Sequence, residues 1–286
     1  MAAELPTGLG GLGLSESIFT ITQELPYNFG VVTQLLNEVD MGFNTGSMRN
    51  IHSPTSRAPT SCLIDQRGKK LGLDPLAVRL ALVKNAKARA VLQKVAQVGR
   101  WGRSMPAGTA QGIALHAEYK GATAVLVEID ARPATVGRPI RDGVTGTRVT
   151  KVVIAVDAGL VVNPEGLEAQ MMGGVNDGIA LALTSSNHLT AGHFLQASWD
   201  NYFYTRQWNT PLSFRCVIMP STGDAPGGAG EAGVASTVAA TACAYARATG
   251  TVPTWFPINH GTLSFTPKPF IPPVPPSPTD GLRHTF

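Results

Sequence analysis

Three apolar runs that lie close together in the sequence most constrain what this chain can fold into. They cover residues 112–119, 122–130 and 148–162. Each run has a length typical of strands and is bounded by glycine, proline or polar residues, which is the pattern of a β-strand in a buried sheet. We therefore predict three neighbouring strands, with a loop over 131–146 between the second and the third.

Helix signals occur on both sides of these runs. The predicted helices cover about 75–84, 85–98, 163–183 and 233–249. Asp74 and Asn163 each precede a proline, and such side chains can accept hydrogen bonds from the free N–H groups of a first helical turn. Gly99 and Gly250 are suited to end the second and fourth helices. Shorter, hairpin-like strands are predicted at about 193–203 and 214–219.

The composition favours a fold with many tight turns. The chain has 31 glycines and 21 prolines, with only 7% aromatic residues, which argues against a simple helical bundle. We predict an α+β fold with mixed sheets and packed helices. The expected parts are a glycine-rich segment 1–24, a first α+β part 25–110 with a helical pair, a second α+β part 111–265, and a proline-rich arm 266–286. The Gly8-x-Gly10-x-x-Gly13 match is interpreted as a loop.

Charge and cysteine content exclude several classes of function. Lysine plus arginine is 23 and aspartate plus glutamate is 19, without a block of like charge, so we expect no nucleic-acid partner. The three cysteines form no CxxC pair, so we predict no disulfide framework, no zinc site and no iron–sulfur cluster in this chain, and interpret them as small buried side chains. No GxSxG hydrolase motif is present.

Neither metal ligation nor export is indicated by the sequence. The six histidines show no HxH or HExxH spacing, so no metal site made of side chains is predicted. The residues after Met1 lack the basic and apolar parts of a signal peptide. We expect a cytoplasmic location by default, with a periplasmic or membrane-associated location through an exported partner as the alternative.

The stretch 226–233, Pro-Gly-Gly-Ala-Gly-Glu-Ala-Gly, is the most informative motif. Its glycines let backbone N–H groups approach a ligand, and a helix N-terminus adds partial positive charge that favours an anionic group. Glu231 is the one carboxylate of this turn. Two interpretations stay open on the motif alone: a general base, or a carboxylate that merely caps the following helix.

The order of motifs resembles a known family. VDAGLVVNPEGLEAQMMGGVNDGIALAL (156–183) followed by PGGAGEAGVASTVAATACAYARATG (226–250) is similar to the C-terminal part of the molybdopterin-binding subunit of the xanthine oxidase/aldehyde oxidase family. The isoquinoline 1-oxidoreductase and bacterial aldehyde dehydrogenase branch resembles it best. TGSMRNIHSPTS (45–56) and the helical stretch 71–102 fit the same order. The resemblance covers roughly residues 25–265.

This resemblance implies roles for particular residues. Glu231 corresponds to the family's active-site glutamate, which acts as a base at the molybdenum centre. Gln170 corresponds to a glutamine that hydrogen-bonds the pterin, and Arg49 to an arginine beside the substrate. Backbone amides near the cofactor are expected from Gly228, Ala229 and Gly230. The sequence departs from the pattern at Ala232, where many relatives have proline, and at His52 and Pro54, just after the arginine.

The resemblance also implies cofactors and partners. The expected cofactor is molybdopterin with molybdenum, with its cytosine dinucleotide form as one option, and the substrate a small aldehyde or N-heteroaromatic molecule. Because relatives are several hundred residues longer, we expect a second molybdopterin-binding chain or fragment to complete the site. A small subunit with 2Fe-2S clusters would take the electrons, with a cytochrome c as a further candidate. The alternative is a non-catalytic structural or assembly subunit that retains the fold.

Overall fold

The computed structural model describes residues 25–35, 48–140, 144–190, 193–194, 196, 199, 202–221 and 223–259. The predicted segment 1–24, with its glycine motif, and the predicted arm 266–286 lie outside the described residues.

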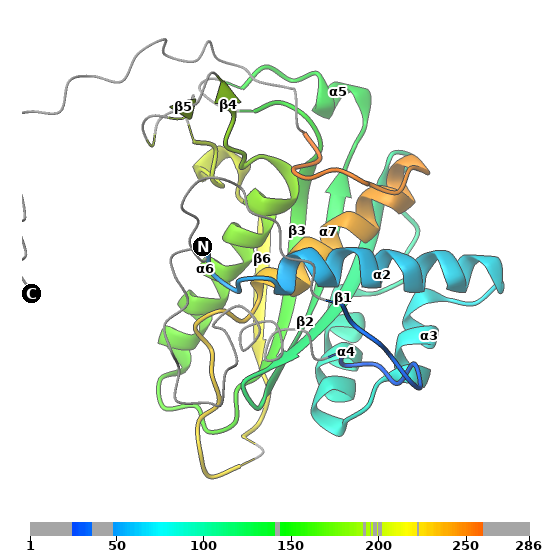
Figure 1. The fold of residues 1–286 in the computed structure, drawn as a ribbon, viewed down its shortest axis with the longest axis vertical. Coiled ribbons are helices and arrows are strands. Elements are labelled where there is room, and N and C mark those ends of the chain that lie inside the picture. Colours follow the sequence, from blue (N-terminus) through cyan, green and yellow to red (C-terminus); the bar gives the residue numbers. More distant parts are fainter. Residues whose placement is uncertain are drawn as a thin grey trace, which may run out of the picture.

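Three helices precede the first two strands, and the remaining helices and strands follow in mixed order (Figure 1). The helices are α2 (Ser53–Lys70), α3 (Pro75–Leu82), α4 (Ala86–Gly99), the short α5 (Pro133–Val136), α6 (Pro164–Leu183) and α7 (Val234–Thr249), with a 3-10 turn η1 at Gln207–Asn209. The strands are β1 (Thr109–Glu118), β2 (Gly121–Asp130), β3 (Arg148–Asp157), β4 (Leu189–Thr190), β5 (His193–Phe194) and β6 (Ser213–Ile218).

A four-stranded mixed sheet in the order β1-β2-β3-β6 forms the centre of the fold. β1 pairs antiparallel with β2, and β2 pairs antiparallel with β3, whereas β6 pairs parallel with β3. β1 and β2 are joined by a tight turn at Tyr119 and Lys120, with φ angles of 51° and 65°. Two successive positive φ angles match the twist of a two-residue hairpin.

Both faces of this sheet are covered. Val152, Ile154 and Val156 of β3 pack in a cluster with α2, α6 and α7, whereas Val153 and Ala155 belong to a second cluster with α4. Side chains alternate between the faces of a strand, so a strand buried on both sides shows an unbroken apolar run. This burial explains why the runs were recognisable in the sequence. The predicted α+β fold with a mixed sheet and packed helices is confirmed.

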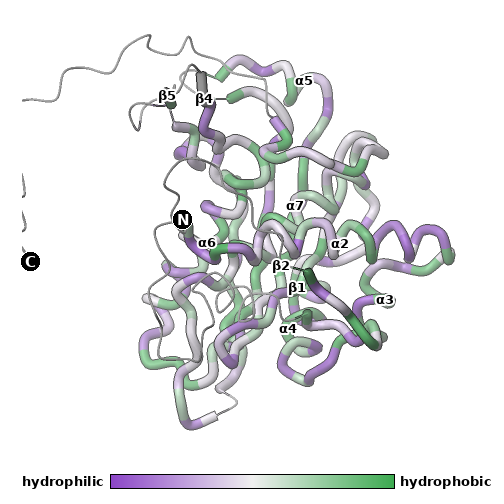
Figure 2. The backbone as a smooth tube through the Cα atoms, viewed as in Figure 1, coloured by the Kyte–Doolittle hydropathy of each residue, from purple (hydrophilic) through white to green (hydrophobic). Residues whose placement is uncertain are grey.

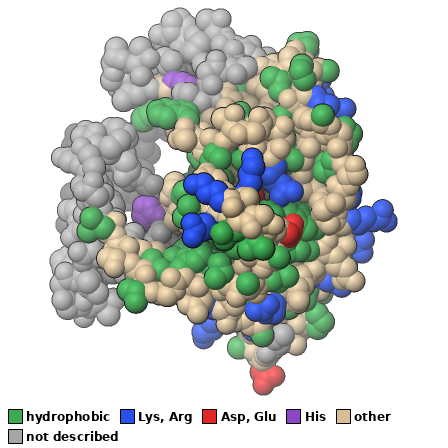
Figure 3. All heavy atoms as spheres, turned by 90° about the vertical axis from the view of Figure 1, so that its right-hand side faces the viewer, with side chains coloured by type: hydrophobic (Ala, Val, Ile, Leu, Met, Phe, Trp, Pro, Cys, Tyr) green, Lys and Arg blue, Asp and Glu red, His purple; other side chains and the backbone are tan. Residues whose placement is uncertain are grey.

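The outer end of α2 is polar. Its last turn carries Arg67, Lys69 and Lys70, and Figure 2 shows this end of the helix as hydrophilic. Lys and Arg side chains gather on the face of the molecule to which α2 points (Figure 3). Positive charge at a helix C-terminus interacts favourably with the helix dipole. In the described part of the chain, no helix is both long and apolar enough to span a bilayer.

The helix predictions based on Asp74, Asn163 and Gly250 are confirmed, whereas α4 is capped by Arg100, with a φ of 55°, and not by Gly99. Asp74 accepts hydrogen bonds from the N–H groups of Leu76 and Ala77, and Asn163 accepts one from Gly166. Gly250, with a φ of 78°, ends α7. These caps act within one turn, so they can be recognised without knowledge of the tertiary fold.

Three predictions are corrected by the structure. The strand predicted over 148–162 ends at Asp157, because Gly159 takes a φ of 69° and pairs with Pro226 instead. Of the strand predicted at 193–203, only residues 193–194 are described as strand. Helix α2 was not predicted, because its sequence is polar and Pro59 lies inside it. An internal proline removes a backbone donor and is read as a helix breaker.

The helices before residue 110 and the strands after it share both hydrophobic clusters. The division at residue 110 stays a prediction. α7 lies directly against β1, since a Cβ at Gly112 would be 2.0 Å from the carbonyl oxygen of Ala240. α6 is equally close to the start of α7, since a Cβ at Gly174 would be 2.5 Å from the carbonyl oxygen of Ala232. The start of α7 is thereby fixed between the sheet and α6.

Candidate functional site

The glycine-rich loop 226–231 lies across the β1–β2 hairpin and the end of β3. The N–H of Gly227 donates to the carbonyl oxygen of Ala158 at 2.7 Å, and the N–H of Gly228 donates to that of Tyr119 at 3.1 Å. A Cβ at Gly228 would be 2.6 Å from the Cβ of Tyr119. Only glycine permits so close an approach, so this contact between the loop and the hairpin requires a glycine at position 228.

Glu231, at the end of this loop, is half-buried and bonded at both carboxylate oxygens. Oε1 accepts the backbone N–H of Asn50 at 3.0 Å, and Oε2 accepts the hydroxyl of Tyr119 at 3.0 Å. Both donors come from outside α7. The carboxylate is therefore held by the tertiary structure, which does not favour the interpretation of Glu231 as a simple cap of the following helix.

Asn50 joins the parts of the site, and sequence reasoning missed it. Its side chain is fully buried, its Oδ1 accepts the N–H of Ala235 at 3.0 Å, and its Nδ2 donates to Glu118 at 2.7 Å. Asn50 thus supplies the N-terminal cap of α7, which has no side-chain cap of its own. Its φ of 69° is a left-handed conformation that asparagine tolerates better than most residues.

A buried polar chain continues behind Asn50. The Nε of Arg57 donates to Nδ1 of His116 at 3.1 Å, and Nε2 of His116 lies 2.7 Å from Oε2 of Glu118. Because the arginine Nε–H can only donate, Nδ1 of His116 acts as the acceptor and the proton lies on Nε2, facing Glu118. Burial lowers the pKa of His116, so the ring is held neutral.

Tyr119 forms the exposed end of this chain. Burial, followed by the neighbouring carboxylates of Glu118 and Glu231, raises the pKa of its phenol to about 12. The hydroxyl therefore stays protonated at neutral pH and remains a donor to Glu231. Nothing in the sequence singled out Tyr119, since a tyrosine in a hairpin turn carries no motif.

Arg49 and Gln170 hold the loop from its other side. The Nε of Arg49 donates to the carbonyl oxygen of Gly230 at 2.7 Å, and its guanidinium pairs with Asp177 of α6 at 3.0 Å. Another of its N–H groups donates to the carbonyl oxygen of Gln170 at 3.2 Å. Nε2 of Gln170 donates to the same Gly230 oxygen at 2.8 Å. Arg49 therefore acts as a clamp between the loop and α6, and its role beside a substrate stays a prediction.

The sequence comparisons agree with this arrangement. Residues 80–211 match the family described as molybdopterin cofactor-binding domain. The chain is 29% identical to the beta chain of isoquinoline 1-oxidoreductase of Brevundimonas diminuta over 71% of its own length and 25% of that protein. It is 25% identical to a nicotinate dehydrogenase subunit of Pseudomonas putida over 79% of its own length and 20% of that protein.

Residues 80–211 resemble a molybdopterin cofactor-binding domain. The resemblance to the xanthine oxidase/aldehyde oxidase family is thereby confirmed. Gln170 lies within the matched range, whereas Arg49 and Glu231 lie outside it. The chain spans a quarter or less of the length of these two curated relatives.

A solved structure shows the same fold. The aldehyde oxidoreductase of Desulfovibrio gigas superposes with a TM-score of 0.55 over 71% of this chain and 40% of that protein, at 13% sequence identity. At this level of identity, the likeness concerns the arrangement of helices and strands. It agrees with a molybdopterin-binding fold for this chain.

The residues around Gly230 fit a pterin cofactor, which offers ring N–H and carbonyl groups and a phosphate to hydrogen-bonding partners. A Cβ at Gly230 would meet nothing nearer than Nε2 of Gln170 at 4.0 Å, so the backbone is open to a ligand there. Gln170 is exposed beside it. The amide of Gly228 donates to the carbonyl oxygen of Tyr119, so its predicted role as a cofactor amide is corrected, whereas that role stays a prediction for Ala229 and Gly230.

The protein side chains offer no evident metal cage. Within the described ranges, no group of three or more His, Cys, Asp or Glu side chains is arranged to hold a metal ion.

Proposed function

We propose that this chain is the cofactor-binding part of a molybdenum hydroxylase that oxidises an aldehyde or an N-heteroaromatic substrate. The observation that carries this proposal is that both carboxylate oxygens of Glu231 accept hydrogen bonds at the end of a glycine-rich loop. The preceding residue, Gly230, leaves room for a ligand. When bound, the molybdenum cofactor would supply Lewis acidity and the capacity to accept two electrons.

Glu231 is the proposed general base. A general base must be fixed within reach of the proton that it takes, and must be ionised before the reaction. The N–H of Asn50 and the hydroxyl of Tyr119 both donate to the carboxylate and fix its position. Each carboxylate oxygen of Glu231 can bind a further hydrogen-bonding partner, so the bonds from Asn50 and Tyr119 can persist while the carboxylate takes up a proton. Gln170, Ala229 and Gly230 would hold the pterin.

The remaining site residues are proposed to come from another chain or region. This chain covers a quarter or less of the curated relatives, and Gly230 of the loop is exposed among the described residues. A 2Fe-2S subunit is the proposed electron acceptor, with a cytochrome c further on. The cytosine dinucleotide form of the cofactor and the cytoplasmic location are likewise proposals.

The test is metal analysis and turnover of the complex purified with its natural partners. We expect molybdenum and a pterin to copurify with the wild-type chain. Glu231→Gln should keep both but lose about 10²–10⁴-fold in turnover, the usual contribution of a general base. Glu168→Gln, an exposed glutamate on α6, is the matched control and should keep wild-type turnover.

Two outcomes would contradict the proposal. Wild-type turnover in Glu231→Gln would remove Glu231 from the mechanism. A wild-type complex that assembles with partners but contains neither molybdenum nor pterin would favour the structural or assembly role instead.

A further inference from the structure

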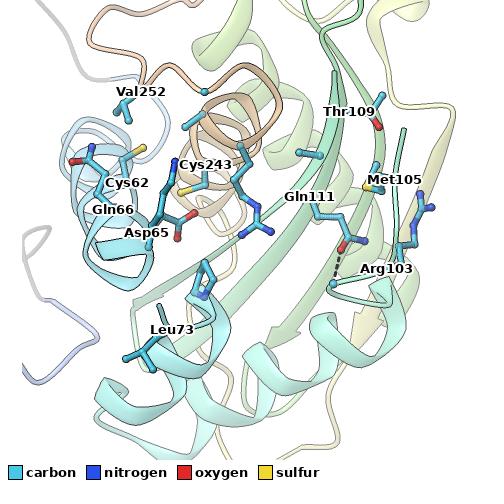
Figure 4. A pocket seen from close by; sticks show the side chains of 17 residues that line it. Cys62, Asp65, Gln66, Leu73, Arg103, Met105, Thr109, Gln111, Cys243 and Val252 are labelled. Carbon is cyan, nitrogen blue, oxygen red and sulfur yellow. Dashed lines mark hydrogen bonds between the residues drawn. The ribbon is translucent and has the colours of Figure 1, made fainter. Parts of the chain in front are cut away.

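A cavity of about 560 Å³ lies at the opposite end of α7 from Glu231. α2, α7 and the start of β1 enclose it, and its lining includes Cys62, Asp65, Gln111, Cys243, Arg247 and Val252. Figure 4 shows these side chains around the open space. None of the proposed cofactor or catalytic residues lines this cavity, so it is separate from the candidate site.

Two of the chain's three thiols meet in this cavity. Cys62 comes from α2 and Cys243 from α7, and both side chains line the cavity and pack in the same hydrophobic cluster. In Figure 4 the two sulfur atoms point toward one another. Both are free thiols, Cys243 is fully buried, and Cys62 is 5% exposed. A small molecule in the cavity therefore reaches Cys62 more readily than Cys243.

A buried cation lies beside the pair. Nη2 of Arg79 donates to the Sγ of Cys243 at 3.7 Å, and the Nη1 of Arg79 pairs with Asp65 at 2.5 Å. The hydrogen bond from Cys243 lowers the pKa of Cys62, and the same bond, followed by burial, raises the pKa of Cys243. Cys62 is therefore the expected nucleophile, because it is the more accessible of the two sulfurs and its lowered pKa favours the thiolate.

We propose that Cys62 and Cys243 are a peroxide-reactive thiol pair that a small hydroperoxide entering the cavity converts into a disulfide between α2 and α7. The sulfur of Cys62 attacks the peroxide, so that a sulfur–oxygen bond forms, the oxygen–oxygen bond breaks and water or an alcohol leaves. The sulfur of Cys243 then displaces the oxygen on Cys62 as water. Two thiols lose two electrons and two protons, and the hydroperoxide is reduced by two electrons.

The bond would join the two helices that begin at the candidate site. α2 starts just after Arg49 and Asn50, and α7 starts just after Glu231. A cross-link between residues so far apart in sequence strongly restricts the unfolded chain, so oxidation should raise the melting temperature. The thiol chemistry does not rest on the proposed hydroxylase function, and its test needs no cofactor.

The test is thiol mapping of the full chain. The reduced protein, freed of reductant, is treated with hydrogen peroxide, alkylated under denaturing conditions, digested and mapped by mass spectrometry. We expect two of the three thiols to be lost, a Cys62–Cys243 disulfide peptide to appear, and a dithiol reductant to reverse both changes. Cys216 is the internal control, because burial raises its pKa to about 12, which leaves it protonated and unreactive.

Variants separate the two roles. Cys216→Ser should form the disulfide at the wild-type rate. Cys243→Ala should stop at a sulfenic acid on Cys62 that a 1,3-dione reagent traps, whereas Cys62→Ala should lose peroxide reactivity. Two results would overturn the proposal: three unmodified thiols in folded wild-type protein after peroxide treatment, or a disulfide that involves Cys216. Both results are measured on the wild-type protein, so they would overturn the proposal even if one of the variants fails to fold.

Discussion

Asn50 bears on three parts of the candidate site at once. Its backbone N–H reaches Glu231, its side-chain amide reaches Glu118, and its side-chain oxygen caps α7. Each of these bonds lies away from bulk water, because Asn50 is fully buried. Loss of one partner leaves the other group unsatisfied, which costs more than the net value of the bond.

We predict that Asn50→Ala destabilises the protein by about 1–3 kcal/mol, because it removes the cap of α7 and one of the two hydrogen bonds to Oε2 of Glu118. Urea denaturation measures this change. Asn50→Gly accepts the left-handed backbone without strain, so it should be destabilised as well if the hydrogen bonds are the cause. Wild-type stability in Asn50→Gly would show instead that only backbone strain matters at this position. Asn187→Ala, at an exposed asparagine, is the control.

At the scale of elements, the packing of α6 on the start of α7 positions the glycine-rich loop 226–231. Gly174 and Gly178 of α6 allow this contact, since a Cβ at Gly178 would lie 2.8 Å from the carbonyl oxygen of Val234 and 2.7 Å from the Cβ of Thr237. Backbone atoms cannot move aside as a flexible side chain can. The two helices would therefore have to separate to accept a larger residue at either position.

We predict that Gly174→Ala destabilises the protein by about 1–3 kcal/mol, since its Cβ would collide with the carbonyl oxygen of Ala232 next to Glu231. Gly173→Ala is the matched control on the same helix, where a Cβ would meet only the end of the Arg49 side chain at 3.2 Å. The control should be neutral or stabilised by about 0.5–1 kcal/mol through helix propensity. Thermal denaturation compares them, and equal stability of the two variants would contradict the close packing.

At the scale of the whole molecule, a sheet covered on both faces encloses polar groups that must keep one protonation state. His116 is 2% exposed and lies between Arg57 of α2 and Glu118 of β1. Its pKa is lowered by burial, so the unfolded chain binds a proton at His116 more readily than the folded protein does. The stability from this neutral ring is present above the ordinary histidine pKa and is lost as the pH falls toward the lowered value.

We predict that the free energy of unfolding falls as the pH is lowered from 7.5 through the ordinary histidine pKa of 6.5. His116→Gln removes this titration, so its stability should depend less on pH over the same interval. Urea denaturation of both proteins at a series of pH values provides the measurement. Parallel pH profiles for wild type and variant would show that His116 is not the group responsible.

The sequence by itself determined the features that depend on residues close together in the chain, namely the helix caps and the apolar strands. The caps of α3 and α6 lie within a few residues of the N–H groups they bind, and the apolar runs of β1, β2 and β3 reflect burial on both sides. The resemblance to a molybdopterin-binding family rests on the same local stretches and is confirmed by the match over 80–211. Helix α2 escaped prediction because its stability comes from packing rather than from its own pattern.

Only the tertiary structure decided how the carboxylate of Glu231 is held. Its donors, Asn50 and Tyr119, lie 181 and 112 residues away in the sequence, and the sequence analysis assigned a role to neither. The same holds for the meeting of Cys62 and Cys243, which the sequence indicated only as separate buried thiols. Contacts between distant segments depend on how the helices pack on the sheet, so they cannot be predicted from the spacing of residues within a short stretch of sequence.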